Sequence, residues 1–157
     1  MPTLASQQST IRTAIEGYLA LLDGISKTES RDLKKLTLAL DALVAAYQLT
    51  DEIDANDLPD DEIEAPQATY RYFYERASAA FPTLGHYEVV ANSEIGMADA
   101  IDDLSDIAID LMETIWHLDH LRSADAIWNF RFGYQTHWGV HLHSLRSYLH
   151  SSNVAAW

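Results

Sequence analysis

Apolar side chains recur at intervals of three and four residues along most of this chain, which is the spacing of one face of an α-helix. The stripe is longest between residues 93 and 120. Its members are Ile101, Leu104, Ala108, Leu111, Ile115 and Leu118. A chain that repeats this pattern in several segments buries one stripe from each helix in a shared core. The sequence therefore predicts an all-α fold.

We expect about five helices in a single bundle-like domain, since 157 residues suffice for one substantial core. The helices are expected at residues 7–22, 26–49, 66–81, 93–120 and 123–152. The turn at residues 121–123 is tight, so the last two helices should form a long antiparallel hairpin.

Two segments are expected to lie outside the helices. Residues 51–64 contain many acidic side chains and no basic one, which is typical of a solvated loop or linker. Residues 82–94 have turn residues at both ends and an apolar middle at residues 87–90. A short strand is possible there, but we find no second strand to pair with it and interpret the segment as a loop.

Composition excludes several classes of function. The chain has no cysteine, which rules out disulfides, thiol catalysis and cysteine-ligated zinc. Its formal net charge of −14 disfavours binding to nucleic acid and to anionic membranes. The first residues lack a signal-peptide pattern and no run approaches the ~20 apolar residues of a membrane span, so we expect a soluble cytoplasmic protein.

The segment between Arg76 and Arg122 contains no Lys or Arg. Within it, polar residues form a second stripe about 150° around the helix from the apolar one. The stripe consists of Asp99, Asp103, Asp106, Asp110, Glu113 and His117. If the apolar stripe faces the core, these acids face water. We therefore predict that substituting Asp103 or Asp106 alone has little effect on stability.

His137 and His141 stand four residues apart, a spacing that lets two imidazoles share a metal ion on one helical face. Trp138 follows His137 where the helical zinc-protease motif has a glutamate, so no protease base is present. Because the acids of the preceding helix are expected to face water, further ligands would come from the 82–94 loop. The candidates there are His86, Glu88 and Glu94.

The alternative is that both histidines are core residues satisfied by polar neighbours. His141 falls among apolar residues, so burial without a carboxylate partner would lower its pKa below about 6.5. A buried acidic partner would instead raise it.

Aromatic residues surround these histidines. Tyr134 and Trp138 could line a ligand pocket with His137 and His141, or they could be core packing. Gly133 and Gly139, inside the same helix, predict close approach of a backbone or an aromatic ring.

Trp128 and Phe132 fall off the main apolar stripe. Large rings in that position suggest a partner interface, and we favour a homodimer through this face.

The second half of the chain resembles an uncharacterised bacterial family of unknown function. The resemblance rests on DDLSDIAIDL at residues 102–111 and AIWNFRFGYQTHWGVH at residues 126–141, and its specific part is the HWG-x-H cluster. It implies a small, mostly helical bacterial protein and supplies no activity, cofactor or catalytic residue.

No Ser-His-Asp set, phosphate-cradling loop or nucleotide fingerprint is present, so we name no catalytic residue. Two hypotheses follow. The first is a non-enzymatic helical module that acts through a protein partner or self-association. No cofactor is predicted for this module. The alternative is a helical-bundle metal or small-ligand binder or enzyme centred on His137 and His141, which could take a divalent metal as cofactor.

Overall fold

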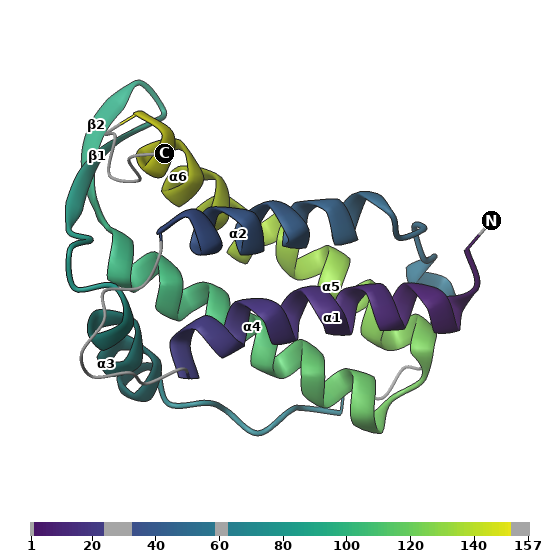
Figure 1. The fold of residues 1–157 in the computed structure, drawn as a ribbon. Helices are drawn as coiled ribbons and strands as arrows, with labels where there is room; N and C mark the ends of the chain where they lie inside the picture. The colour runs from purple at the N-terminus through teal and green to yellow at the C-terminus, as the bar shows by residue number, and fades with distance from the viewer. Residues whose placement is uncertain (1, 24–32, 59–62, 152–157) are drawn as a thin grey trace.

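The computed structural model describes residues 2–23, 33–58 and 63–151. These residues form six α-helices, one short 3-10 helix and one two-stranded hairpin (Figure 1). In chain order the elements are α1 (Leu4–Asp23), α2 (Leu33–Gln48), η1 (Ala55–Asp57), α3 (Tyr70–Ala80), β1 (His86–Ala91), β2 (Glu94–Asp99), α4 (Ala100–His120), α5 (Ser123–Thr136) and α6 (Trp138–Ser151). The all-α prediction therefore holds in the main, but the described part has one helix more than expected and a small sheet.

Helix α4 is the central element. It contacts α1, α3, α5, α6 and β2, so most of its circumference is covered. Figure 1 shows α3 and the β-hairpin at the end where α4 begins, with α1 crossing it and α2 alongside α1. None of the described helices is long and apolar enough to cross a bilayer.

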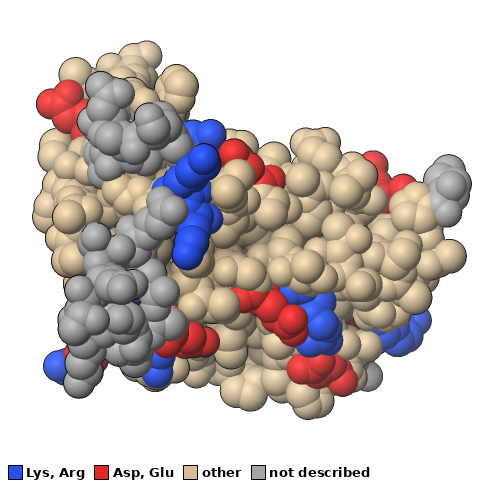
Figure 2. Space-filling view, viewed as in Figure 1, with Lys and Arg blue, Asp and Glu red and all other residues tan. Residues whose placement is uncertain are grey.

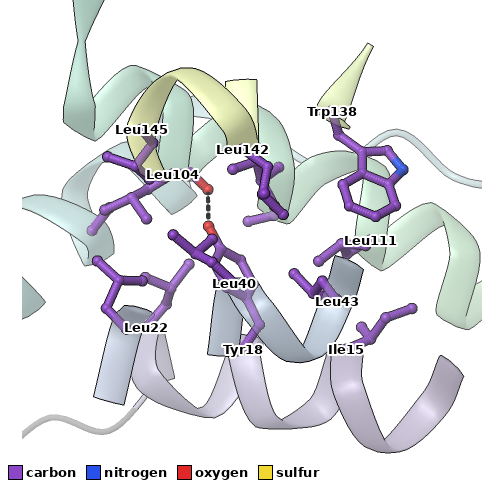
Figure 3. Packing of buried hydrophobic residues seen from close by; sticks show 14 of the residues in the cluster. Ile15, Tyr18, Leu22, Leu40, Leu43, Leu104, Leu111, Trp138, Leu142 and Leu145 are labelled. Carbon is purple, nitrogen blue, oxygen red and sulfur yellow. Dashed lines mark hydrogen bonds between the residues drawn. The ribbon is translucent and has the colours of Figure 1, made fainter. Parts of the chain in front are cut away.

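The core lies between α1, α2, α4 and α6. Fully buried leucines such as Leu40, Leu104 and Leu142 meet there (Figure 3), each contributing about 1.5–3 kcal/mol by burial. The Tyr18 hydroxyl donates a 2.7 Å hydrogen bond to the Leu104 carbonyl, which satisfies the one polar atom of that ring. The apolar stripe predicted at residues 93–120 contributes buried residues such as Leu104, Ala108 and Leu111 to this core.

The segment expected to be a loop is a β-hairpin instead. β1 and β2 are antiparallel, with Val90 opposite Ile95. The two-residue turn between them, Asn92 and Ser93, has positive φ angles of 51° and 66°, as the favoured hairpin turns require. The strand that seemed to lack a partner pairs with residues 94–99, which we had assigned to the next helix. Asp99 caps α4, which therefore begins after the predicted residue 93, and its side chain accepts a hydrogen bond from the Ile101 amide.

The predicted continuous C-terminal helix is broken at His137, whose φ of −143° and ψ of −83° are not helical. The break folds Trp138 back onto α5: a Cβ added at Gly133 would lie 2.8 Å from Cδ1 of the Trp138 ring. A Cβ added at Gly139 would lie 2.1 Å from the Tyr134 carbonyl oxygen. The expected close approach at both glycines is therefore confirmed.

One other predicted boundary differs. α3 begins at Tyr70 rather than at Pro66, and residues 63–69 are not helical. The predicted start of the second helix, near residue 26, lies outside the described residues. The acidic segment is exposed as expected over most of its described part, and it includes the short exposed helix at Ala55–Asp57.

Candidate metal centre

The acidic stripe of α4 does not face water as a whole. Asp103 is only 4% exposed, and its carboxylate accepts a short hydrogen bond from the Tyr87 hydroxyl of β1. Asp106 and Asp110 are half-buried. The prediction that Asp103 is solvated is therefore wrong, because α4 is central and its polar face is covered by α6 and the hairpin. The reason for expecting little effect on stability from substituting Asp103 is therefore removed, and for Asp106 the expectation stays a prediction.

His141 from α6 meets this stripe with both ring nitrogens. Its Nδ1 lies 2.8 Å from Asp103 Oδ1, and its Nε2 lies 3.4 Å from Asp106 Oδ2. The hydrogen bond to Asp103 is the main reason that the pKa of His141 is raised, and the charge of Asp106 adds to it, while partial burial opposes both. The lowered pKa expected without an acidic partner does not occur, because α4 supplies two.

His137 stands at the junction of α5 and α6. Its Nδ1 lies 2.6 Å from Asp110 Oδ2. Its ring centroid is 5.0 Å from that of His141, with the two rings nearly perpendicular. The His137 side chain is half-exposed, which leaves the arrangement open to solvent on this side. Each histidine is thus held through Nδ1 by its own carboxylate.

Asp106, His137 and His141 each place one possible ligand atom within 4.8 Å of the other two. No other such group of three or more occurs within residues 2–23, 33–58 and 63–151. Ligands at about 2.0–2.1 Å from a tetrahedral zinc ion are about 3.3 Å apart. The 3.4 Å between His141 Nε2 and Asp106 Oδ2 already matches that separation.

The third member of this group, Asp106, comes from α4, whose acids were expected to face water. The loop residues that we had preferred lie elsewhere: His86, Glu88 and Glu94 are exposed on the hairpin and are not part of the group. The His86 ring faces Asp99, 4.0 Å away.

The site has an excess of negative charge. Asp103, Asp106 and Asp110 form ion pairs with His137 and His141. Burial raises the pKa of Asp106, and the neighbouring Asp102 adds to this, while His141 opposes it. Two tyrosines of α3 donate hydrogen bonds to further acids near the site, Tyr70 to Asp102 and Tyr74 to Asp99. Such a cluster of partly buried carboxylates favours a bound cation.

The four residues of the candidate pocket divide into two pairs. His137 and His141 face α4, as described. Trp138 has no exposed surface and packs against the rings of Phe130 and Tyr134 at 5.2 and 5.1 Å. Tyr134 also stacks on Tyr47 at 3.9 Å. The aromatic pair is thus part of the packing, and the histidine pair belongs to the polar face.

The Trp128 and Phe132 rings stack on each other with centroids 4.8 Å apart, and Phe132 is 49% exposed. They border a small hollow of about 60 Å³ together with Glu52, Ile53 and Arg131. These contacts do not test the interface predicted for Trp128 and Phe132, which stays a prediction.

Asp103, Asp106, Asp110 and Tyr87 were not identified from the sequence as parts of a site. A usable signal was present. The three acids are spaced by three and four residues, His137 and His141 by four, and the two helices were already expected to be antiparallel neighbours. The absence of Lys and Arg between residues 76 and 122 left the histidines as the available cations nearby.

No curated protein and no solved structure matches this chain. A family model described as a domain of unknown function, DUF5063, matches residues 4–155. This confirms the resemblance to a family of unknown function and extends it from half the chain to nearly all of it. By that match, the chain belongs to the DUF5063 family.

Proposed function

We propose that this protein binds one divalent transition-metal ion through Asp106, His137 and His141. The observation that carries the proposal is the orientation of the two imidazoles: each has its Nδ1 against a carboxylate, Asp110 or Asp103. Metal-binding histidines commonly donate their second ring N–H to a carboxylate, which fixes the tautomer and leaves the other nitrogen for the metal. The Nε2 atoms of both rings are the ligand atoms in this proposal.

Two imidazoles and one carboxylate suit zinc, ferrous iron, manganese or nickel, and the chain has no thiolate that would select a softer ion. Three protein ligands leave at least one coordination position for water or a small ligand. The half-exposed His137 gives that position access to solvent. No nucleophile or general base is assigned, so the proposal is for metal binding and names no reaction.

Protons compete with the metal for the same atom. In the metal-free protein, His141 Nε2 lies 3.4 Å from Asp106 Oδ2, which favours a proton on that nitrogen. A metal ion would replace this proton, so affinity should fall as the pH is lowered.

Metal analysis of protein purified without a histidine tag tests the proposal, together with calorimetric titration of the chelator-treated protein with Zn²⁺ and Mn²⁺. We expect close to one ion per chain. His141→Ala and Asp106→Asn should each abolish stoichiometric binding, while His150→Ala, an exposed histidine of the same helix, should leave it intact. Failure to take up any of these ions at pH 7.5, or equal binding by His141→Ala, would refute the site.

A second candidate function is that of a homodimeric protein-interaction module. It is supported by the large apolar side chains that are exposed on the surface, including Phe132, Leu38 and Leu49. The net charge of −14 supports a protein partner rather than nucleic acid. Light scattering at micromolar concentration measures whether the chain is a dimer, and a strict monomer would remove this candidate.

A further inference from the structure

Two acids of α4 close to Asp106 are each held by a tyrosine from another element. Tyr70 of α3 donates a short hydrogen bond to Asp102. Tyr87 of β1 donates another to Asp103. Asp102 and Asp103 precede Asp106 by four and three residues, so the three carboxylates are neighbours on the surface of α4. The tyrosines therefore act on the acids that stand next to the proposed metal ligand.

The carboxylates around the centre differ in what already occupies them. Both oxygens of Asp103 are engaged in hydrogen bonds, whereas Asp102 and Asp110 each have one oxygen so engaged. Within the described part of the chain, no hydrogen bond reaches the carboxylate of Asp106, which faces a histidine nitrogen 3.4 Å away. The acid that is free of hydrogen bonds is thus the one that belongs to the group of three possible ligands.

A tyrosine differs from an arginine as a partner for an acid, because its hydroxyl is neutral. On the face formed by α1 and α2, acidic and basic atoms lie side by side (Figure 2). One ion pair of the structure joins Arg146 to Asp41 at 2.8 Å, and such a pair cancels both charges. Burial is the main reason that the pKa values of Tyr70 and Tyr87 are raised, so both hydroxyls stay protonated. They fix the orientation of their carboxylates and leave the negative charge of the site in place.

The number of carboxylates that can reach an ion decides which ion is bound. Ca²⁺ takes about six to eight oxygen ligands, and Mg²⁺ is also held through carboxylates and water. Imidazole instead suits zinc, iron and nickel. With Asp102 and Asp103 held by tyrosines, the centre offers two imidazoles and one free carboxylate. This set is poor in oxygen for a calcium ion and adequate for a zinc ion.

We propose that Tyr70 and Tyr87 determine the metal specificity of this centre. By holding Asp102 and Asp103 they leave Asp106 as the one carboxylate ligand, which favours a transition-metal ion such as Zn²⁺ over Ca²⁺ and Mg²⁺. The inference rests on the proposed metal site and goes beyond it by stating how the site selects its ion. Neither tyrosine is a ligand, so both act through the acids that they hold.

Calorimetric titration of the chelator-treated protein with Zn²⁺ tests the inference when it is carried out with and without millimolar Ca²⁺. The weakening of Zn²⁺ binding by Ca²⁺ gives the ratio of the two affinities. Wild type should bind Zn²⁺ far more tightly than Ca²⁺. Tyr70→Phe removes only the hydroxyl of a ring that is 41% exposed, so the fold should be retained. The freed Asp102 should lower the ratio about tenfold, since calcium affinity depends on the number of charged ligands. Tyr87→Phe should lower it too.

Two controls separate specificity from a general effect on the structure. Tyr72→Phe changes an exposed tyrosine of the same helix, whose ring lies against Arg76, and should leave the ratio unchanged. Asp102→Asn added to Tyr70→Phe takes away the freed carboxylate and should restore the ratio of wild type. A disturbed fold would not be repaired by this second change. Circular dichroism checks that each variant is folded.

The outcomes distinguish this inference from the metal site on which it rests. If wild type takes up no ion, the metal site is refuted and the inference with it. If Zn²⁺ binds but the ratio is unchanged in folded Tyr70→Phe and Tyr87→Phe, the metal site stands and the inference is overturned. Wild type that binds Ca²⁺ as tightly as Zn²⁺ overturns it equally. So does a ratio that Asp102→Asn fails to restore.

Discussion

The two faces of α4 are both covered by protein, but they are stabilised in different ways. On one face, Leu104 and Leu111 have no exposed surface and pack against residues of other helices (Figure 3). On the other, Asp103 is almost as buried and is held by Tyr87 and His141. A polar helical stripe therefore indicates different chemistry from the apolar stripe, and it does not by itself indicate contact with water.

The apolar face needs only shape and volume from its neighbours, whereas the polar face needs specific partners. Each buried carboxylate requires a hydrogen-bond donor, because an unpaired buried charge is costly. Those donors come from a β-hairpin and from a helix more than thirty residues away in the chain.

The largest expected effect concerns Asp103. Asp103→Lys places a charge in a site built for a carboxylate and should lower the free energy of unfolding by about 3–5 kcal/mol, as breaking a buried pair does. Leu104→Ala, next to it on the apolar face, should cost about 2–5 kcal/mol. Glu88→Lys, an exposed acid beside Tyr87 in sequence, should change stability by less than about 0.5 kcal/mol. Chemical denaturation measures all three. A cost for Asp103→Lys as small as that of Glu88→Lys would mean that the polar face is solvated after all.

The next effect concerns Asp110, which holds His137 but is not itself in the ligand group. Asp110→Asn should weaken zinc binding about 10–100-fold, as the loss of a carboxylate that orients a metal-bound histidine does. Asp119→Asn serves as the control. Asp119 lies on α4 like Asp110, but it pairs with Arg12 of α1 and is not part of the site. Calorimetric titration gives both affinities. Unchanged binding in Asp110→Asn would show that the carboxylate does not orient His137.

The smallest effect is in the pH dependence of the chelator-treated protein, where two histidines contribute with opposite sign. The pKa of His141 is raised, chiefly by its bond to Asp103, so its contribution to stability is present below about 6.5 and lost as the pH rises through its folded pKa. The pKa of His117 is lowered by burial. Its contribution is therefore lost as the pH falls below about 6.5 toward its folded pKa.

Titration of the two rings by NMR measures this difference directly. His141 should titrate above His117, and Asp103→Asn should lower the pKa of His141 with little effect on His117. The reverse order of titration would contradict the contacts described for His141.

The elements that sequence alone predicted are those whose own residues determine them. The stripes of α1, α2 and α4 specify the core, and Gly133 and Gly139 indicated the close packing around Trp138. The hairpin was missed because its second strand, EIGMAD, is short and continuous with a strongly helical segment. The break at His137 was missed because residues on both sides of it keep helical spacing.

The candidate site was only half predicted, for a related reason. His137 and His141 were identified by their spacing, which depends on local structure. Asp106 was assigned to solvent because its angle on α4 was measured from one apolar stripe, as if the helix had a single covered face. The second face is covered through the packing of α6 and the hairpin on α4. The spacing of residues within α4 alone does not indicate this packing.

The central claim is that the polar face of α4 is a metal centre completed by α6. X-ray absorption spectroscopy of the zinc-loaded, untagged protein tests it most directly. The account predicts two imidazole nitrogens and a carboxylate oxygen at about 2.0–2.2 Å, with one imidazole lost in His137→Ala. A zinc shell of oxygen atoms without imidazole, or a spectrum that His137→Ala leaves unchanged, would contradict it.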